Sequence, residues 1–528
     1  MIRHHHYREH IMNKLGTLII AAVMLAAQLP AQKLPKDFDS YVENVRKQFS
    51  VPGIAVAVVK DGKVVLAKGY GTKNVNTGEK VDAKTNFSIA SNTKAFTATA
   101  LGILVDEGKL KWTDRVIDHL PWFQMSDPYV SREMQIIDLL VHRSGLGLGA
   151  GDLMIWPDNS FTRKDIVAHL RNVPLSTSFR SSYAYDNILY FVAGEVIEQV
   201  SGMPWEQFIQ QRILSKLGMD HSTIKYSDAV KNGNYASPHA EISGVVRPVT
   251  PSDSDRINPA ASINTNADDI AKWLICQLDS GRTDKGNRLF STNVTKKIWS
   301  IVTPVPVGTV SKEIAPLQSN FIGYGGGFYL RDFRGEKMVM HTGGLNGSVS
   351  LVAMIPELRL GVAVFTNQEM SGAFYSIGWR VFDSYLGEKF DWLSGYYALK
   401  ERADSINASK ELSAMTSRDS LSHPSLPLEK YAGTYSDPWY GDITLSLAGG
   451  KLFIQMNATP VLHGTLEHYQ YDTFIARWDN PELRADSYIT FSLHPDGSID
   501  HAAMKAVSPA TDFSYDFQDL YLKPKQGK

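Results

Sequence analysis

Apolar residues recur along the chain with two spacings, which indicates a mixed α/β protein. Residues 38–49 show the three- to four-residue spacing of an amphipathic helix. Residues 53–59 and 64–70 are apolar runs of strand length around a Lys-Asp-Gly-Lys turn. Helical patterns fill the middle of the chain, and strand-length runs return at 338–340, 350–355 and 361–365. This order predicts one antiparallel sheet built from the first and last strands and flanked by helices, with a helical subdomain inserted between them.

The pattern changes after about residue 396. Residues 398–415 form a charged helical stretch, and residues 416–427 are rich in Ser and Pro, as expected of a connection between domains. Short strands follow, separated by Gly and Asp turns, at 443–447, 452–456, 488–493 and 502–506. The sequence therefore predicts an α/β domain at 33–395, a linker at 396–427 and an all-β domain at 428–528.

The N-terminal segment, residues 1–31, predicts export. Asn13-Lys14 precedes an apolar run at 15–29 and the sequence Pro30-Ala31-Gln32, which together are typical of a secretory signal peptide cleaved near Ala31. Residues 1–11 form an upstream extension. The apolar run is short for a membrane span, so an uncleaved anchor is the less favoured alternative. With no cysteine near the cleavage site, no lipid anchor is expected, and the expected location is the periplasm or the exterior.

Composition narrows the class of protein only slightly. A chain of 528 residues that is 43% hydrophobic can bury more than one core, and a net charge of −1 gives no sign of nucleic-acid binding. The single cysteine, Cys276, lies in an apolar helical segment, so we expect a buried thiol and no intrachain disulfide.

Candidate chemistry begins at Ser91-Asn92-Thr93-Lys94, where a polar strand end becomes an apolar helix. Residues three apart share a helix face, so Lys94 points where Ser91 points. A buried lysine can lose its proton near neutral pH, and its neutral amine can then accept the proton of a serine. The motif alone is weak evidence for a catalytic site, because a helix cap followed by a surface lysine has the same sequence pattern.

Two later motifs strengthen this interpretation. Tyr185-Asp186-Asn187 runs into an apolar helix, and His341-Thr342-Gly343-Gly344 lies between two predicted strands. In this order the three motifs resemble those of the serine β-lactamase and penicillin-binding-protein superfamily. The tyrosine form is similar to the branch that contains class C β-lactamases, D-alanyl-D-alanine carboxypeptidases and esterases.

Further segments resemble the same family over roughly residues 38–390. Residues 142–146 are similar to a loop that borders the family's site, and residues 258–262 and 268–273 are similar to another family segment, although two of its usual glycines are replaced. Residues 428–435 look like the start of the lipocalin-like domain often appended to these hydrolases. The aromatic residues of that domain either reach the active site or, as we prefer, fill the barrel core; they include Trp439, Tyr440 and Trp478.

The chemistry and the resemblance together assign roles. Ser91 is the expected nucleophile, and Lys94 and Tyr185 are expected to share the proton transfers, with the identity of the base left open. The amide of Asn187 can accept a hydrogen bond from Lys94 and donate one to a substrate. By resemblance, the oxyanion would be bound by the backbone N–H groups of Ser91 and Gly344, beside Thr342 and Gly343.

His341 stands where most class C β-lactamases have a lysine. Because histidine is mostly neutral at pH 7, it does not assure a fixed positive charge for a substrate carboxylate. This favours a peptidase or a related hydrolase over an efficient β-lactamase. The alternative is a strand-end histidine with a satisfied ring.

Competing patterns are weaker. There is no G-x-S-x-G nucleophile elbow, and the glycine-rich segment 145–149 lacks the context of a nucleotide loop and is expected to be a loop near the site. Three glycines at 325–327 predict close backbone packing. Residues 6–10 match the H-x-x-E-H pattern of some zinc sites, but they lie upstream of the predicted signal peptide, so no metal is expected.

We therefore expect a serine hydrolase of the S-x-x-K type that needs no cofactor. Its first predicted activity is that of a peptidase or amidase on D-amino-acid peptides or related β-lactam-like amides. An esterase, an acyltransferase with an alcohol acceptor, and a slow penicillin-binding sensor are the alternatives. The expected partner is a small-molecule or short-peptide acyl substrate, with substrate choice set by loops at 145–160, 242–259 and 304–321, and with neither nucleic acid nor a stable membrane anchor.

Overall fold

The computed structural model describes residues 34–252, 255, 258–283 and 286–525. The predicted signal peptide and the H-x-x-E-H pattern at 6–10 lie outside these residues. The helices are α2 Phe38–Gln48, α3 Thr93–Asp106, α4 Val116–His119, α5 Pro128–Glu133, α6 Arg163–His169, α7 Ile188–Ser201, α8 Trp205–Ile209, α9 Ser215–Leu217, α10 Tyr226–Lys231, α11 Asn258–Ala261, α12 Ala267–Leu278, α13 Thr292–Ile298, α14 Ser371–Leu386 and α15 Trp392–Thr416.

The strands fall into two main groups. Those of the first domain are β1 Gly53–Lys60, β2 Lys63–Gly71, β3 Phe87–Ser88, β4 His239–Ile242, β5 Val245–Pro248, β6 Asn264–Thr265, β7 Thr303–Val305, β8 Ile322–Tyr324, β9 Tyr329–Phe333, β10 Glu336–Leu345, β11 Ser348–Ile355 and β12 Leu360–Thr366. Those of the second are β13 Gly433–Asp437, β14 Gly441–Ala448, β15 Lys451–Met456, β16 His463–Gln470, β17 Thr473–Trp478, β18 Ser487–Leu493, β19 Ile499–Ala506 and β20 Tyr521–Pro524.

An eight-stranded antiparallel sheet organises the first domain, in the order β2-β1-β12-β11-β10-β9-β8-β7. Strand β1 pairs with β12, Ala57 opposite Ala363, so the first and last parts of the domain share one sheet as predicted. Successive side chains of β1 point to opposite faces, and both faces are buried. The strand is therefore a continuous apolar run rather than an alternating one.

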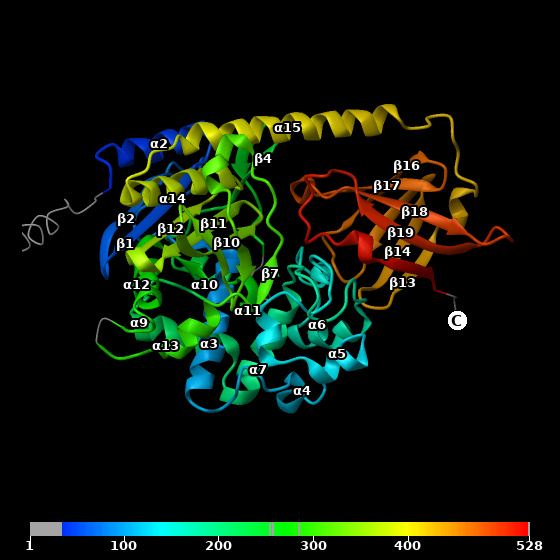
Figure 1. Ribbon diagram of the computed structural model, residues 1–528. Helices are drawn as coiled ribbons and strands as arrows, with labels where there is room; N and C mark the ends of the chain where they lie inside the picture. The colour runs from blue at the N-terminus through cyan, green and yellow to red at the C-terminus, as the bar shows by residue number, and fades with distance from the viewer. Residues whose placement is uncertain (1–33, 253–254, 256–257, 284–285, 526–528) are drawn as a thin grey trace, which may run out of the picture.

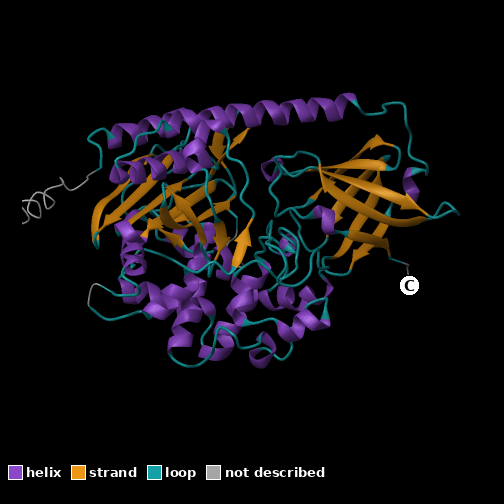
Figure 2. Cartoon of the chain, in the orientation of Figure 1, coloured by secondary structure: helices purple, strands orange, loops and turns teal. Residues whose placement is uncertain are grey.

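Helices cover both faces of this sheet, as Figure 2 shows. Ile54 and Val56 pack in one core with residues of α2, α14 and the start of α15. Ala55 and Ala57 belong to a second core, which includes residues of α3, α7 and α12. The predicted fold, a sheet flanked by helices with a helical subdomain inserted, is confirmed.

The C-terminal segment forms a closed antiparallel barrel of eight strands, β13 to β20 in chain order. It closes where β20 pairs with β13. The four strands named from the sequence are β14, β15, β18 and β19, and the lipocalin-like architecture is confirmed. Trp439 and Tyr440 are each 1% exposed and belong to the apolar core, which agrees with the preferred interpretation for these two residues. Trp478 belongs to the same core but also lines the cavity at the candidate active site, so it fits both alternatives.

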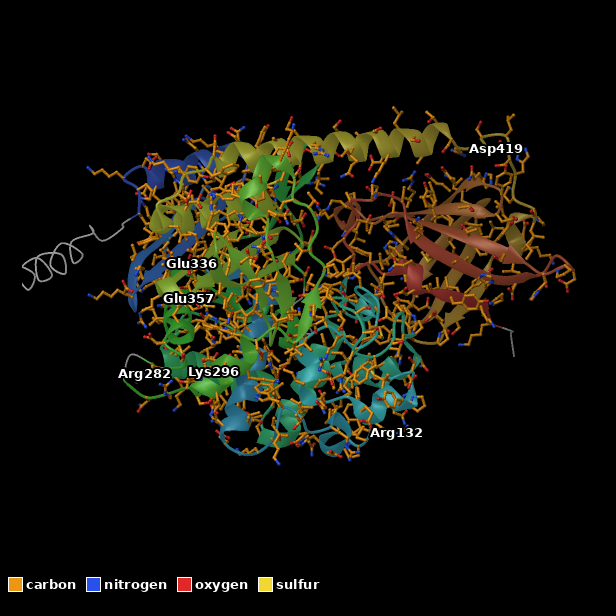
Figure 3. All side chains as sticks on the ribbon, viewed as in Figure 1. Arg132, Arg282, Lys296, Glu336, Glu357 and Asp419 are labelled. Atoms are coloured by element: carbon orange, nitrogen blue, oxygen red, sulfur yellow. The ribbon has the colours of Figure 1, made fainter. Side chains whose placement is uncertain are left out.

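Helix α15 runs along the top of both domains in Figure 1. It begins at Trp392, whose buried side chain packs on the first domain with Tyr396, and it continues without a break to Thr416. The boundary that the sequence suggested at residue 396 thus falls inside one helix. Charged side chains such as Lys296, Arg132 and Asp419 are exposed on the outside of the molecule (Figure 3).

Candidate active site

Ser91 lies in a tight turn that leads directly into α3. Ala90, just before it, has a φ of 47°, a left-handed conformation that is uncommon for a residue with a side chain. The turn is tied to β11, because Ser350 Oγ donates to the Ile89 carbonyl at 2.8 Å and accepts from Asn92 Nδ2 at 2.8 Å. Surrounding structure therefore holds a strained turn that presents Ser91 to the cavity.

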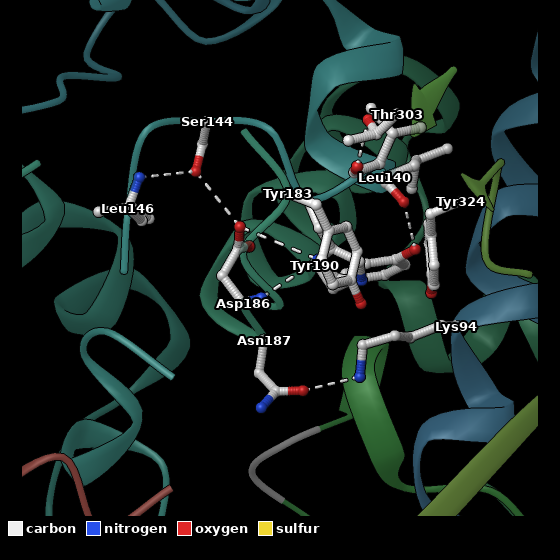
Figure 4. A network of polar contacts seen from close by, with 12 residues as sticks. Lys94, Leu140, Ser144, Leu146, Tyr183, Asp186, Asn187, Tyr190, Thr303 and Tyr324 are labelled. Carbon is white, nitrogen blue, oxygen red and sulfur yellow. Dashed lines mark hydrogen bonds and ion pairs between the residues drawn. The ribbon is translucent and has the colours of Figure 1, made fainter. Parts of the chain in front are cut away.

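Lys94 is fully buried, one helical turn after Ser91. Its Nζ lies 2.7 Å from Asn187 Oδ1, a contact that Figure 4 marks. It also lies 2.9 Å from Ser91 Oγ and 3.2 Å from the Ala260 carbonyl. Burial disfavours the charged ammonium and lowers the pKa of Lys94 to about 7, against the opposing effect of the Asp152 carboxylate. A substantial fraction of Lys94 is thus neutral at physiological pH.

The phenol of Tyr185 faces the same centre. Its ring centroid is 4.9 Å from Lys94 Nζ, and its buried hydroxyl has no hydrogen-bond partner of good geometry among the described residues. Burial raises the pKa of Tyr185 well above 10, although the nearby Ser91 hydroxyl acts in the opposite direction. Tyr185 is therefore a neutral phenol at physiological pH.

His341 is fully buried, at the centre of β10. Its Nδ1 lies 2.5 Å from the Thr342 carbonyl, which can only accept, so Nδ1 carries the proton and Nε2 accepts from the Tyr324 hydroxyl at 2.8 Å. Burial lowers the pKa of His341 to about 3. The ring is neutral, in keeping with the sequence argument, and its hydrogen bonds are satisfied.

Gly343 allows β10 to approach the serine turn. A Cβ at this position would lie 2.2 Å from the Ile89 carbonyl oxygen and 2.9 Å from the Ser91 nitrogen. At Gly344 a Cβ would meet only a Val349 methyl group, at 3.8 Å. The close approach therefore depends on Gly343, not on the neighbouring glycine.

The amide of Asn187 has one expected partner and one that was not predicted. Its oxygen accepts from Lys94 as predicted, but its nitrogen donates to Asp152 Oδ2 at 2.8 Å. One of the two amide hydrogens is therefore directed to Asp152, which leaves the other for the predicted hydrogen bond to a substrate. Asp152 was not predicted, because an acidic residue after a glycine-rich loop carries no sequence signal of this contact.

The site opens into a cavity of about 1730 Å³ between the two domains. Residues of the first two predicted specificity loops line it, whereas none of the described lining residues belongs to 304–321. The barrel supplies much of the remaining wall, including Trp478 and the segment 505–515. The predicted site residues on this wall are Ser91, Tyr185, Asn187, His341, Thr342, Gly343 and Gly344.

Buried histidine and tyrosine rings surround the catalytic groups, and sequence reasoning missed most of them. His142, in the predicted bordering loop, accepts a hydrogen bond from the Asp186 N–H at 3.2 Å, and its ring lies tilted against that of Tyr185, with centroids 4.3 Å apart. The hydroxyls of Tyr183 and Tyr329 form a short hydrogen bond. In the sequence, these tyrosines could have been found only from their positions near the motifs at 185–187 and 341–344.

Two other predictions concern regions around the site. The three glycines at 325–327 pack closely as expected: a Cβ at Gly327 would lie 2.8 Å from the Lys94 carbonyl oxygen. Within the described ranges, His, Cys, Asp and Glu side chains do not gather in groups of three or more that could hold a metal ion. Every helix in those ranges is too short or too polar to span a lipid bilayer.

Comparisons with known proteins concern the family and the fold of the chain. A family model described as Beta-lactamase matches residues 38–382, and one described as Domain of unknown function (DUF3471) matches residues 417–524. Unguisins hydrolase ungD of Aspergillus violaceofuscus is 28% identical over 471 residues, which cover 84% of this chain and 83% of that protein. Protein flp of Staphylococcus aureus (strain MW2) is 28% identical over 339 residues, or 63% of each chain.

Solved structures share the fold at lower identity. The octameric penicillin-binding protein homologue from Pyrococcus abyssi has a TM-score of 0.60 and 22% identity, with 93% of this chain and 99% of that chain covered. SurE has a TM-score of 0.54 and 18% identity, with 92% and 98% covered. At these identities the likeness concerns the fold alone.

Proposed function

Because the chain belongs to the beta-lactamase family, we propose that it is an exported serine hydrolase that works through an acyl-enzyme on Ser91. Its preferred substrates are peptides that contain D-amino acids, or related β-lactam-like amides. The observation that carries this proposal is the 2.9 Å separation between Lys94 Nζ and Ser91 Oγ inside a buried site. The relative named as a hydrolase supports the reaction class.

Lys94 is the proposed general base. A neutral amine has two hydrogens and one lone pair, and its three neighbours match this set. As an ammonium, Nζ donates to Ser91 Oγ, Asn187 Oδ1 and the Ala260 carbonyl. After loss of one proton, the two remaining hydrogens serve Asn187 Oδ1 and the Ala260 carbonyl, both of which can only accept, and the lone pair is left to accept from the Ser91 hydroxyl. Tyr185, whose pKa is raised well above 10, is a proton donor rather than a phenolate base.

The acyl-transfer step follows from these positions. Ser91 Oγ bonds to the substrate carbonyl carbon while its proton passes to Lys94 Nζ. The backbone N–H groups of Ser91 and Gly344 stabilise the oxyanion. The carbon–nitrogen bond then breaks, the leaving nitrogen takes the Tyr185 phenol proton, and Lys94 returns its proton to Tyr185. Water repeats the sequence on the acyl-enzyme, with the acid released and Ser91 restored.

The size of the cavity supports a peptide substrate. Pockets for drug-sized ligands measure roughly 300–1,000 Å³, and this cavity is larger, at about 1730 Å³. It extends from the serine across the interface between the domains, where a chain of several residues can lie. A single small lactam would fill only part of it.

One observation favours a second candidate, an esterase or acyltransferase. His341 occupies the position where a cation would bind a terminal substrate carboxylate, yet it is buried and neutral, with a pKa of about 3. Acyl donors without a free carboxylate near the scissile bond, such as esters or internal amides, therefore fit this wall better than a free C-terminal dipeptide does.

Location and partners remain part of the proposal. The predicted leader at 1–31 supports export to the periplasm or the exterior. The expected partner is a soluble acyl substrate.

The test compares the purified chain with Ser91→Ala after exposure to a penicillin, by intact-protein mass spectrometry, while drug loss and turnover of an activated ester are followed in parallel. A persistent adduct that requires Ser91 supports the acyl-enzyme and favours the peptidase or the slow sensor. Rapid drug loss would instead indicate a β-lactamase. Ester turnover without adduct or drug loss indicates the esterase or acyltransferase. A wild-type chain that forms no adduct and turns over neither penicillin nor ester would refute the proposed function.

A further inference from the structure

A loop of the barrel domain enters the catalytic domain beside the active site. This loop follows β19 and ends at Asp516, a fully buried residue. The Asp516 carboxylate accepts hydrogen bonds from the backbone N–H groups of Gly151 and Leu153, at 2.7 Å and 2.8 Å. One side chain of the barrel thus binds both ends of a three-residue turn in the other domain. We call residues 149–153 the catalytic turn.

The catalytic turn is connected to the nucleophile from its other side. Asp152 Oδ2 accepts from Asn187 Nδ2 at 2.8 Å, Asn187 Oδ1 accepts from Lys94 Nζ at 2.7 Å, and Nζ lies 2.9 Å from Ser91 Oγ. Each link is a direct hydrogen bond between buried or half-buried groups. Displacement of the turn would therefore move the amide that orients Lys94.

A second contact from the same loop reaches the proton donor. The Phe513 ring stands edge-on to the Tyr185 ring, with centroids 6.0 Å apart. A Cβ at Gly149 would lie 2.9 Å from both the carbonyl oxygen and a ring carbon of Phe513, so the glycine permits this approach. The Gly149 N–H donates to the Tyr185 carbonyl at 2.9 Å. The barrel loop and the catalytic turn thus enclose Tyr185 together.

Other contacts join the two domains away from the serine. The Ser160 N–H donates to the Ala458 carbonyl at 2.8 Å, and His169 Nδ1 lies 2.6 Å from the Trp439 carbonyl oxygen. Arg484 forms an ion pair with Glu369. None of these contacts involves Asp516, so we expect the domains to stay docked when that residue is changed. A specific effect of Asp516 on catalysis can therefore be separated from docking.

We propose that Asp516 is a positioning residue, through which the barrel domain fixes the catalytic turn and thereby sets the geometry of Asn187 and Lys94. This inference rests on the proposed function of Ser91. The barrel is then part of the catalytic apparatus rather than an appended wall, although Asp516 itself does not touch the reacting atoms. Its loss should slow the chemistry and leave substrate binding largely unchanged.

The test uses the full chain with Asp516→Asn, which keeps the side-chain shape but replaces one acceptor oxygen by a donor facing a backbone N–H. Asp519→Asn, three residues later, is the matched control. Asp519 accepts a hydrogen bond from Trp439 through its backbone carbonyl, and its side chain makes no hydrogen bond among the described residues, so the substitution leaves that contact in place. We expect kcat for an activated ester to fall at least about tenfold in the first variant, with KM changed less than about twofold and Tm close to wild type. The control should match wild type in all three.

Each outcome decides one point. Wild-type kcat in Asp516→Asn, or a rise in KM alone, would overturn the inference. If Asp516→Asn does not fold, Asp516→Glu keeps both acceptor oxygens but displaces them by one methylene, and the same kcat loss is expected. Failure of both variants to fold would also overturn it, because Asp516 would then support the fold and not the site. A wild-type chain no more active than Ser91→Ala would instead refute the proposed function.

Discussion

Acylation should depend on a single deprotonation with its midpoint near pH 7, because Lys94 must lose a proton before it can act. Its pKa is about 7 in place of the ordinary 10.5. At about 1.36 kcal/mol per pKa unit, the buried site as a whole disfavours the ammonium by a net roughly 5 kcal/mol, with burial opposed by the charges of Asp152 and Asp186. At pH 7, about half of the enzyme molecules then have a neutral Lys94, whereas an ordinary lysine would be neutral in roughly one molecule in 3,000.

The assay is kcat/KM for an activated ester between about pH 5 and pH 10, which reports the free enzyme's essential groups. Activity should rise with pH through the midpoint and be about a hundredfold below its plateau two pH units lower. The pKa of His341 is about 3 and that of Tyr185 is raised well above 10, so neither residue adds a limb in this range.

Lys94→Met serves as the control, since it has a similar volume and no amine. It should lose the pH dependence and about 10²- to 10⁴-fold in rate, which is the usual contribution of a general base. A midpoint near pH 10 in the wild type, or the same limb in Lys94→Met, would refute the assignment of Lys94 as the base.

Three further predictions concern neighbouring residues. Gly343→Ala should reduce activity at least about a hundredfold, because its Cβ would lie 2.2 Å from a carbonyl oxygen of the serine turn. Gly344→Ala should keep activity within a few fold of the wild-type rate, and initial rates on an ester distinguish the two variants. Tyr185→Phe should lower kcat about 10²-fold while Tm stays equal or rises, because the buried hydroxyl lost has no hydrogen-bond partner among the described residues; calorimetry and kcat measurements check both effects. Asp152→Asn should move the acidic limb of the pH profile to lower pH, because a negative charge on Asp152 raises the pKa of Lys94. Burial raises the pKa of Asp152 itself well above its ordinary value, so an unchanged midpoint would show that Asp152 carries no charge there, and a higher midpoint would contradict the electrostatic role.

Sequence patterns could predict the parts of this protein that depend on local periodicity. The spacing of Ser91 and Lys94 fixes their shared helix face, and the apolar runs at 53–59 and 361–365 are neighbouring strands of the sheet. Short strands were harder to recognise: β7 and β8 have three residues each and are defined by their partners.

Contacts between distant segments could not be predicted in this way. Asp516 and Gly151 are 365 residues apart, and an aspartate in a polar loop looks the same whether it faces water or a buried turn. The second hydrogen bond of Asn187 was missed for a similar reason, since only the folded chain places Asp152 beside it. Local patterns therefore pointed to Ser91 as the candidate nucleophile, whereas the side chains around it could be recognised only in the folded structure.

The separation of Asp516 from the catalytic turn also affects when activity can begin. Ribosomes add about 5–20 residues per second, so synthesis of the 365 residues from Gly151 to Asp516 takes roughly 20 to 70 seconds. During this interval the serine helix exists without the residue that fixes its surroundings. On this proposal the chain reaches its full rate only once Asp516 has been made, and a chain cut short before Asp516 should show the lowered kcat expected of Asp516→Asn.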